Sequence, residues 1–408
     1  MTLPLLLAGP LLRRVEAERI TLWLVTREPV QFQLRLNTAD LQTPLLLRPT
    51  AHNALPVGQR AFVQALVFHT PISLEQGFDY RLNYRLESDP DGTWQALESQ
   101  YPHLLYTDES AIHVPFSSQL KEIWHGSCRK PHFPSSDGLA AADQELERRH
   151  ARHLPQPQAL FMTGDQVYVD DLCGPMLQAV HEVIALLGLH DETFPGTPEA
   201  HPPFKDSRAL YAHNALYGRR AYLPSTLASN RWSRLFYRKT ALITSQYCDN
   251  HLITFAEVFA LYLLSWSPTL WEVIEWPRLE STLATLSPPQ QLLYTQEKEA
   301  LDGFIDGLPR VQRLLAHLPT YMIFDDHDVT DDWNLTRGWE QEVYGHPLSR
   351  RMVGNALAGY WLCQGWGNSP EKFESIYQLA SESFTPDGLT KHEDFIDALF
   401  DWEEWHYG

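Results

Sequence analysis

Cysteine is scarce in this sequence, and its few copies form no recognisable pattern. The chain of 408 residues has four cysteines, and none lies in a CxxC pair. These are Cys128, Cys173, Cys248 and Cys363. Scattered positions of this kind indicate neither a zinc knuckle nor a disulfide framework.

Long apolar runs and net positive charge are also lacking. No stretch approaches the roughly 20 apolar residues of a membrane span. The apolar N-terminal segment is short, lacks a preceding basic region and is interrupted by Pro4 and Pro10, so we expect a first strand there and not a signal peptide. Acidic residues outnumber basic ones, 51 to 32, for a formal charge of −19. This balance argues against nucleic acid or an anionic membrane as the main partner. We expect a cytoplasmic protein.

Several catalytic motifs are absent. The sequence contains no GxSxG elbow, no P-loop and no GxGxxG, which disfavours a serine hydrolase, a nucleotide kinase and a Rossmann dehydrogenase. It also has no HxH pair, with which many amidohydrolases begin their set of metal ligands.

The first part of the chain has the pattern of antiparallel strands. Apolar residues alternate with polar ones from Val30 to Asn37 and from Phe78 to Leu86, and a Pro-Asp-Gly turn follows at 90–92. A period of two marks strands with one buried face. Several such strands predict a small β-sandwich domain over residues 1–118.

From residue 119 the pattern changes to short apolar runs that end abruptly in polar residues. The runs end at Trp124, Thr163 and Phe324, directly before the segments HGSC, GD and DDH. Each run predicts a buried strand followed by a loop. Ligands of layered α/β folds bind just beyond the carboxyl ends of strands, so we expect these three ends to converge on one site in a second domain, residues 119–408.

A helical insertion is expected between the second and third of these strands, at about 173–320, with proline-rich breaks at 195–203 and 287–289. Apolar residues follow helical spacing from Gln296 to Leu318. Trp266, Trp271 and Trp276 also lie in the insertion, and we interpret them as core residues.

The segment DDHDVTDDWN at 325–334 is the most informative. It carries five carboxylates, on Asp325, Asp326, Asp328, Asp331 and Asp332. Two carboxylates 4 Å apart repel by about 4 kcal/mol at an effective dielectric near 20. A bound cation would turn this repulsion into attraction. The alternative is an acidic surface loop, which the embedded histidine and the preceding apolar strand disfavour.

Two further segments carry possible metal ligands. In GDQVYVDD, at 164–171, a tight turn at Gly164 lets the Asp165 carboxylate emerge from the sheet edge. With Tyr168 it forms a hard ligand pair that suits a ferric ion, although a core tyrosine is the alternative. The adjacent Asp170 and Asp171 are candidates for outer hydrogen-bonding groups or a helix N-cap.

In HGSCRKPH, at 125–132, Cys128 is either an inert core residue or a thiolate ligand. Arg129 and Lys130 are able to neutralise a phosphate in an otherwise acidic cleft. His125 and His132 are weaker ligand candidates than Cys128.

The order of these segments resembles the PhoD-like alkaline phosphatase and phosphodiesterase family, within the calcineurin-like metallophosphoesterases. The resemblance rests on Ser127-Cys128, on Gly164-Asp165 with Tyr168, and on Asp325-Asp326-His327 with Trp333. It covers about 25 residues. It implies an N-terminal β-sandwich followed by a layered αββα domain.

The resemblance also implies roles for individual residues. Cys128, Asp165 and Tyr168 would bind Fe3+, and Asp165 would bridge to a second metal such as Ca2+, although other divalent metals are possible. Asp326 would be both a metal ligand and a catalytic residue, and Asp332 a further ligand. His327 would protonate the leaving oxygen or stabilise the phosphoryl group, and Arg129 would bind the phosphate of a small phosphoester substrate.

One departure from the family pattern stands out. The family has a late GDVH-type motif that supplies further metal ligands, and no such motif follows His327 here. We therefore expect either a catalytic domain that is incomplete at its C-terminal end or a site completed differently. The predicted function is metal-dependent phosphoester hydrolysis, and the alternative is a metal-binding pseudo-enzyme or an inactive fragment.

Overall fold

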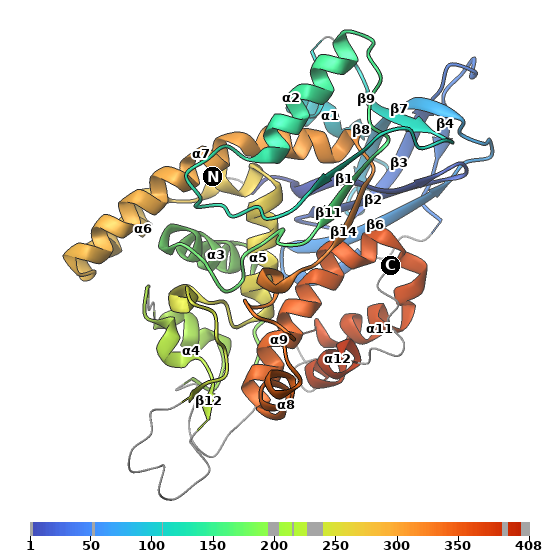
Figure 1. Cartoon of the computed structure of the whole chain (residues 1–408). Coiled ribbons are helices and arrows are strands. Elements are labelled where there is room, and N and C mark those ends of the chain that lie inside the picture. Colours follow the sequence, from blue (N-terminus) through green and yellow to red (C-terminus); the bar gives the residue numbers. More distant parts are fainter. Residues whose placement is uncertain are drawn as a thin grey trace, which may run out of the picture.

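The computed structural model describes residues 3–50, 54–107, 109–194, 204–213, 216–226, 240–385 and 391–400. These residues form a mixed α/β structure with several antiparallel sheets and one parallel sheet (Figure 1). The predicted proline-rich break at 195–203 and the residues after 400 lie outside the described part of the chain. Among the described residues, no helix combines the length and the apolar composition needed to cross a membrane.

The N-terminal region contains two antiparallel sheets that pack face to face. One sheet has the order β1-β2-β6-β5 and the other β4-β3-β7-β8, with β9 also pairing with β7. The strands are β1 (Leu6–Glu16), β2 (Arg19–Thr26), β3 (Val30–Asn37), β4 (Leu45–Leu47), β5 (Ala54–Gly58), β6 (Ala61–His69), β7 (Gln76–Leu86), β8 (Gln95–Ala96) and β9 (Ile112–Ser117). The predicted alternation is confirmed, because Val30, Phe32, Leu34 and Leu36 are buried between the sheets while their neighbours are not.

The sheet that contains β1 is buried on both faces. Leu6 and Leu12 face the core of the sandwich, whereas Leu7 and Leu11 belong to the core that the helices form. Trp23 of β2 points to the helical side, where its indole N–H donates to the carbonyl of Leu362 over 2.8 Å. This sheet is therefore a middle layer shared by the two regions on either side of residue 118.

A parallel sheet of three strands follows, in the order β10-β11-β14. Its strands are β10 (Ile123–Gly126), β11 (Ala159–Thr163) and β14 (Thr320–Ile323). The three predicted strands are confirmed, and their carboxyl ends lie at the same edge. The prediction of a buried strand is wrong for β10: it is the edge strand of this sheet, and Ile123 is 53% exposed.

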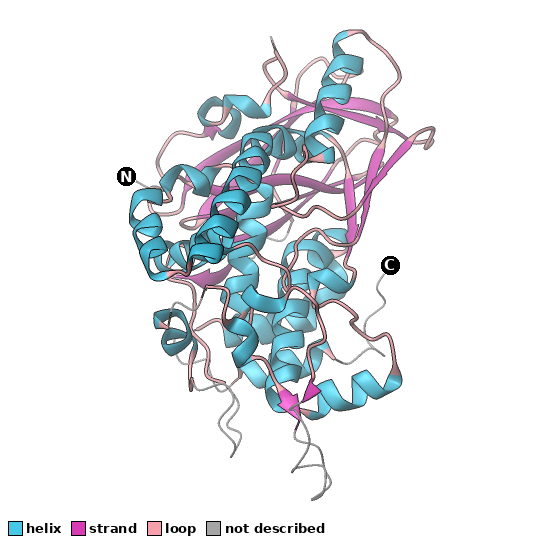
Figure 2. Cartoon of the chain, turned by 60° about the vertical axis from the view of Figure 1, so that its left-hand side comes forward, coloured by secondary structure: helices cyan, strands magenta, loops and turns pink. Residues whose placement is uncertain are grey.

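The rest of the described chain is mostly helical, with one short antiparallel pair, β12 (Ser225–Thr226) and β13 (Thr240–Ala241). The helices are α1 (Leu97–Gln100), α2 (Gly138–Ala151), α3 (Gly174–Leu187), α4 (Ser207–Ala212), α5 (Phe255–Trp266), α6 (Trp276–Glu280), α7 (Pro288–His317), α8 (Arg337–Gly345), α9 (Pro347–Tyr360), α10 (Trp366–Asn368), α11 (Glu374–Ser383) and α12 (His392–Leu399). Figure 2 shows most of them gathered beside and below the strands.

Helices α5 and α7 show how burial and N-terminal capping stabilise the insertion. Helix α5 is buried along its whole length and begins with a reciprocal capping box between Thr254 and Glu257. Helix α7 starts at Pro288, at the predicted proline-rich break of 287–289 and ahead of the periodic stretch from Gln296, and Ser287 and Gln290 form another capping box there. The prediction that tryptophans of the insertion are core residues is confirmed for Trp266 and Trp271, and Trp276 is half-buried.

Candidate metal centre

Three loops meet at the carboxyl edge of the parallel sheet. The loop after β10 is hydrogen-bonded to the loop after β11, through Cys128 N–H to Gly164 O (3.2 Å) and Arg129 N–H to Asp165 O (2.9 Å). The loop after β11 is in turn bonded to the loop after β14, through Val169 N–H to His327 O (2.9 Å). Main-chain bonds therefore fix the three segments that the sequence singled out relative to one another.

The backbone of these loops adopts conformations that most residues avoid. Cys128 has φ 59°, Asp165 has φ 52° and Gly164 has φ 128°. A Cβ on Gly164 would lie 2.3 Å from the Cβ of Asp325, so only glycine lets the two loops approach this closely. Non-glycine residues in the left-handed region cost free energy and cluster at functional sites.

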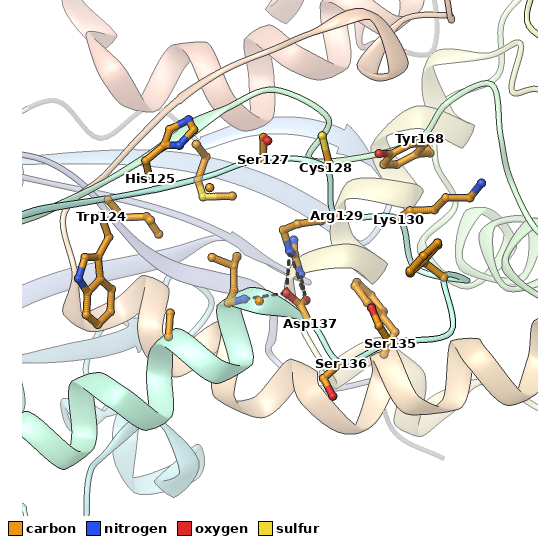
Figure 3. A pocket seen from close by; sticks show the side chains of 18 residues that line it. Trp124, His125, Ser127, Cys128, Arg129, Lys130, Ser135, Ser136, Asp137 and Tyr168 are labelled. Carbon is orange, nitrogen blue, oxygen red and sulfur yellow. Dashed lines mark hydrogen bonds and ion pairs between the residues drawn. The ribbon is translucent and has the colours of Figure 1, made fainter.

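Cys128, Asp165 and Tyr168 form the first part of the site. The sulfur of Cys128 lies 3.2 Å from Oδ2 of Asp165, and Figure 3 shows the hydroxyl of Tyr168 turned toward the same sulfur. Burial raises the pKa of the Cys128 thiol and of the Asp165 carboxyl. Burial, and then the negative charge of Asp165, raise the pKa of Tyr168. A carboxylate, a thiol and a phenol in contact are a set of donors that a cation would bind, with loss of the protons of the thiol and the phenol.

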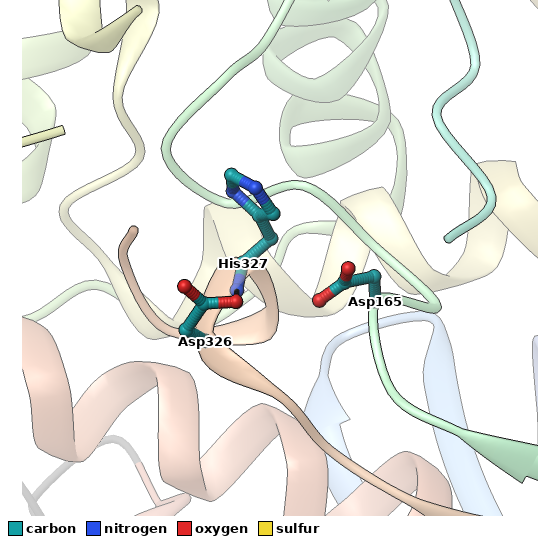
Figure 4. A group of neighbouring side chains, drawn as sticks. All are labelled: Asp165, Asp326 and His327. Atoms are coloured by element: carbon teal, nitrogen blue, oxygen red, sulfur yellow. Dashed lines mark hydrogen bonds between the residues drawn. The ribbon is translucent and has the colours of Figure 1, made fainter. Parts of the chain in front are cut away.

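Asp165 also belongs to a second grouping. Ligand atoms of Asp165, Asp326 and His327 lie within 4.8 Å of one another. Figure 4 shows the carboxylates of Asp165 and Asp326 facing each other from the loops after β11 and β14. Oδ1 of Asp165 is buried and accepts no hydrogen bond from the described residues. An orphaned carboxylate oxygen between two ligand groups is what a bound cation would satisfy.

His327 is held by Asp170 and Tyr168. Its Nδ1 lies 3.0 Å from Oδ1 of Asp170, and its ring stacks on that of Tyr168 with centroids 4.6 Å apart. Burial alone would lower the pKa of His327, but the hydrogen bond and charge of Asp170 outweigh burial and raise it to about 9. Because Nδ1 is bound to Asp170, Nε2 is the nitrogen available to a ligand or a substrate.

Asp170 is an outer group of the site. It also accepts from the hydroxyl of Ser245 (2.7 Å) and from Asp331 N–H (2.9 Å). The suggestion that Asp170 or Asp171 caps a helix is wrong, because the N-cap of α3 is Cys173. Asp171 instead pairs with Lys130.

Asp328, to which the sequence analysis gave no role, ties two of the loops together. This fully buried carboxylate accepts from the N–H groups of Asp165 (2.7 Å) and Asp325 (3.0 Å) and lies 3.4 Å from Val167 N. Burial raises the pKa of Asp328 to about 7, in spite of these hydrogen bonds. The only signal in the sequence was a carboxylate next to His327, which does not distinguish a ligand from a buried hydrogen-bond acceptor.

Two side chains complete the surroundings of Asp328. Tyr262 of α5 donates from its hydroxyl over 3.3 Å, and Gln364 donates from its amide over 3.1 Å. Gln364 lies in the short π-helix η8 (Trp361–Gly365), a type of irregularity that often occurs near functional sites. The three loops of the candidate metal centre are therefore anchored to the helical core.

Asp332 and Arg129 are predicted site residues whose observed contacts are with other protein groups. The backbone N–H of Asp332 donates to Oδ2 of Asp326 over 3.2 Å, and the grouping of ligand atoms within the described residues does not include its carboxylate. The guanidinium of Arg129 is buried and donates to Asp137 over 2.7 Å (Figure 3). Metal binding by Asp332 and phosphate binding by Arg129 stay predictions.

The weaker histidine candidates also have other partners. Nε2 of His125 lies 2.6 Å from the hydroxyl of Thr163, and Nε2 of His132 lies 3.3 Å from Asp171. Neither is part of the grouping around Asp165.

Comparisons with known proteins give no further assignment. The sequence matches no protein-family model, and it matches no curated protein. The resemblance to PhoD-like phosphatases therefore rests on the short segments at the three strand ends.

Proposed function

We propose that the protein is a metal-dependent phosphoester hydrolase of the PhoD-like type, with a layered metallophosphoesterase architecture around its parallel sheet. The observation that carries the proposal is the grouping of Asp165, Asp326 and His327, with ligand atoms within 4.8 Å, at the edge where Cys128 also contacts Asp165. These residues come from three loops that are far apart in the sequence. A surface cluster of acidic residues would not need the strained, glycine-dependent approach of those loops.

The donor set fits hard cations. Cys128, Asp165 and Tyr168 would hold Fe3+, and Asp165 with Asp326 would hold a second ion such as Ca2+, with Asp332 as a further candidate. Such cations supply charge neutralisation of a phosphate and activation of water near neutral pH. They also offset the formal charge of −19 that would otherwise repel an anionic substrate.

The protein's own residues have distinct tasks in this proposal. Asp170 holds the imidazole of His327 through Nδ1, which leaves Nε2 directed to give a proton to the departing oxygen. Asp328 holds the main chain of Asp165 and Asp325 and thereby sets the spacing of the carboxylates. Lys130 pairs with Asp171, and its ammonium group lies 5.9 Å from the centroid of the Tyr168 ring.

The test is elemental analysis and a visible spectrum of the purified full chain, followed by assays with phosphomonoesters and phosphodiesters. A phenolate bound to ferric iron colours a protein, so Tyr168→Phe should bleach the sample. Tyr247→Phe is the matched control, because Tyr247 is 60% exposed and lies outside the three ligand loops. Hydrolysis that depends on metal and is lost in Asp165→Asn would support the proposal.

Two outcomes would argue against it. A colourless, iron-free wild type would remove the ferric assignment of Cys128, Asp165 and Tyr168. Stoichiometric metal binding without hydrolysis of either ester class would instead support the second candidate, a metal-binding protein without turnover. The missing GDVH-type motif is the observation that favours this second candidate.

A further inference from the structure

A cavity of about 770 Å³ adjoins the metal centre. It lies between strand β10, the start of helix α2 and the middle of helix α7, from which Phe304 projects. Its volume is within the range of small-molecule sites, roughly 300–1,000 Å³. None of Asp165, Asp326 and His327 lines it, so it is a separate compartment from the grouping of carboxylates.

The walls of this cavity are mainly apolar. The apolar side chains that line it are Trp124, Phe133, Leu139, Ala142, Leu160, Met162 and Phe304. Its polar lining outside the ion pair is His125, Ser127, Lys130, Ser135 and Ser136, and Lys130 is itself paired with Asp171. The phenyl ring of Phe133 is 58% exposed, so part of it is available for contact with a bound group. The buried charges in the wall, Arg129 and Asp137, neutralise each other through their ion pair. The cavity therefore suits an uncharged, apolar group.

Cys128 and Tyr168 connect the cavity to the metal centre. Both side chains line the cavity, and the sulfur of Cys128 also contacts Asp165. Figure 3 shows Cys128 and Tyr168 at one end of the cavity and Trp124 at the other, with the ion pair of Arg129 and Asp137 between them. A ligand with one group at the carboxylates can therefore extend past Cys128 into the apolar space.

A second cavity, on the other side of Lys130, is less suitable for an apolar group. Its volume is about 610 Å³, and Asp171, Asp249 and Glu297 contribute carboxyl groups to its lining. An apolar group placed there would desolvate these carboxyl groups without giving them a partner.

We infer that the cavity beside Cys128 and Tyr168 binds an aromatic-sized, uncharged organic group of the ligand, so that the substrates are phosphoesters of apolar alcohols or phenols. The substrate class rests on the proposed function, whereas the binding of an apolar group to the cavity does not.

The cavity can be filled by substitution at a position that tolerates a side chain. Gly138 lines the cavity, and a Cβ added to it would meet no atom within 4 Å, so Gly138→Trp places an indole in open space. Gly303 of α7 also has nothing within 4 Å of its Cβ position and faces a different hollow, which makes Gly303→Trp the matched control. Ala142→Trp is a second filling variant from the next turn of α2. Circular dichroism checks that each variant is folded.

Two binding measurements are made on the full chain with metal added. Equilibrium dialysis with 1-naphthol tests the cavity alone. We expect Gly138→Trp and Ala142→Trp to weaken this binding by about tenfold or more and Gly303→Trp to change it less than about twofold. Calorimetry with phenylphosphonate and methylphosphonate tests the connection, and we expect the phenyl compound to bind wild type about tenfold more tightly.

The outcomes separate the two proposals. The inference is overturned if 1-naphthol does not bind wild type, if the filled variants bind it equally well, or if both phosphonates bind with equal affinity. If neither phosphonate binds but both filled variants lose 1-naphthol, the phosphoester function fails while the apolar site stands. If Gly303→Trp has the larger effect, the organic group lies elsewhere and the assignment of this cavity is wrong.

Discussion

Substitution of Asp328 tests whether this buried carboxylate holds the loops of the candidate site together. Its carboxylate joins the loop after β11 to the loop after β14 by accepting from Asp165 N–H at 2.7 Å and Asp325 N–H at 3.0 Å. In Asp328→Ala both buried donors lose their acceptor. A buried donor left without a partner costs about 1–3 kcal/mol, so we expect the free energy of unfolding to fall by about 4 kcal/mol.

Asp328→Asn should be much milder. Its amide oxygen can still accept from both N–H groups, and its NH₂ group would face Val167 N–H, Tyr262 and Gln364, so Val167 N–H loses its acceptor. Oε1 of Gln364 accepts no hydrogen bond from the described residues, so a turn of that amide provides an acceptor for the new NH₂ group. We expect a loss of about 1 kcal/mol, near the value of one ordinary hydrogen bond.

Urea denaturation of wild type, Asp328→Ala and Asp328→Asn measures these differences. Asp306→Ala is the control, because Asp306 is an exposed carboxylate on α7 and its removal should change stability by less than about 0.5 kcal/mol. Asp328→Ala should also weaken metal binding by about tenfold or more, as is usual when a group that orients a ligand is removed. If alanine costs less than about 1 kcal/mol, or if asparagine is as damaging as alanine, Asp328 does not hold the loops together.

Two further predictions concern the backbone at the site and the pH dependence of stability. Gly164→Ala should destabilise the protein by at least about 2 kcal/mol, since φ is 128° and the new Cβ would lie 2.3 Å from the Cβ of Asp325. Gly345→Ala, where nothing lies within 4 Å, should be neutral or slightly stabilising in the same thermal denaturation assay, and equal effects would refute the steric argument. Burial lowers the pKa of His392 to about 4, below its ordinary 6.5, so the unfolded chain binds the proton more readily. The contribution of His392 to stability is therefore present above pH 6.5 and decreases as the pH falls toward 4, by about 2 kcal/mol at pH 5. In urea denaturation at pH 8 and pH 5, His392→Gln should lose about that much less stability than wild type, and an identical loss would contradict the assignment.

The sequence predicts well those features that depend on neighbouring residues. The alternation from Val30 to Asn37 predicts β3, because successive side chains of a strand point to opposite faces. The three apolar runs before the loops predict β10, β11 and β14, since each run is long enough for one strand and ends in residues that disfavour burial. The proline-rich break at 287–289 coincides with the start of α7, where Ser287 and Gln290 also carry a readable capping signal.

Features that depend on distant partners were not predictable in the same way. Arg129 is a predicted phosphate ligand, and its ion pair with Asp137 at the start of α2 is a contact that no local pattern indicates. Asp332 looks equivalent to Asp326, yet it contributes its backbone N–H to that residue. Which side chain of an acidic segment points inward depends on the loop conformation, and that conformation is fixed by contacts from other parts of the chain.

Local periodicity and composition are therefore enough to predict the strands, the reactive segments at strand ends, the meeting of those ends at one site and the residue types available for a metal. The short distances between Asp165, Asp326 and His327, the burial of Asp328 between two loops and the apolar cavity beside Cys128 come from the folded chain. Contacts between residues far apart in the sequence leave no local pattern, since they depend on how the sheet and the helices around it pack.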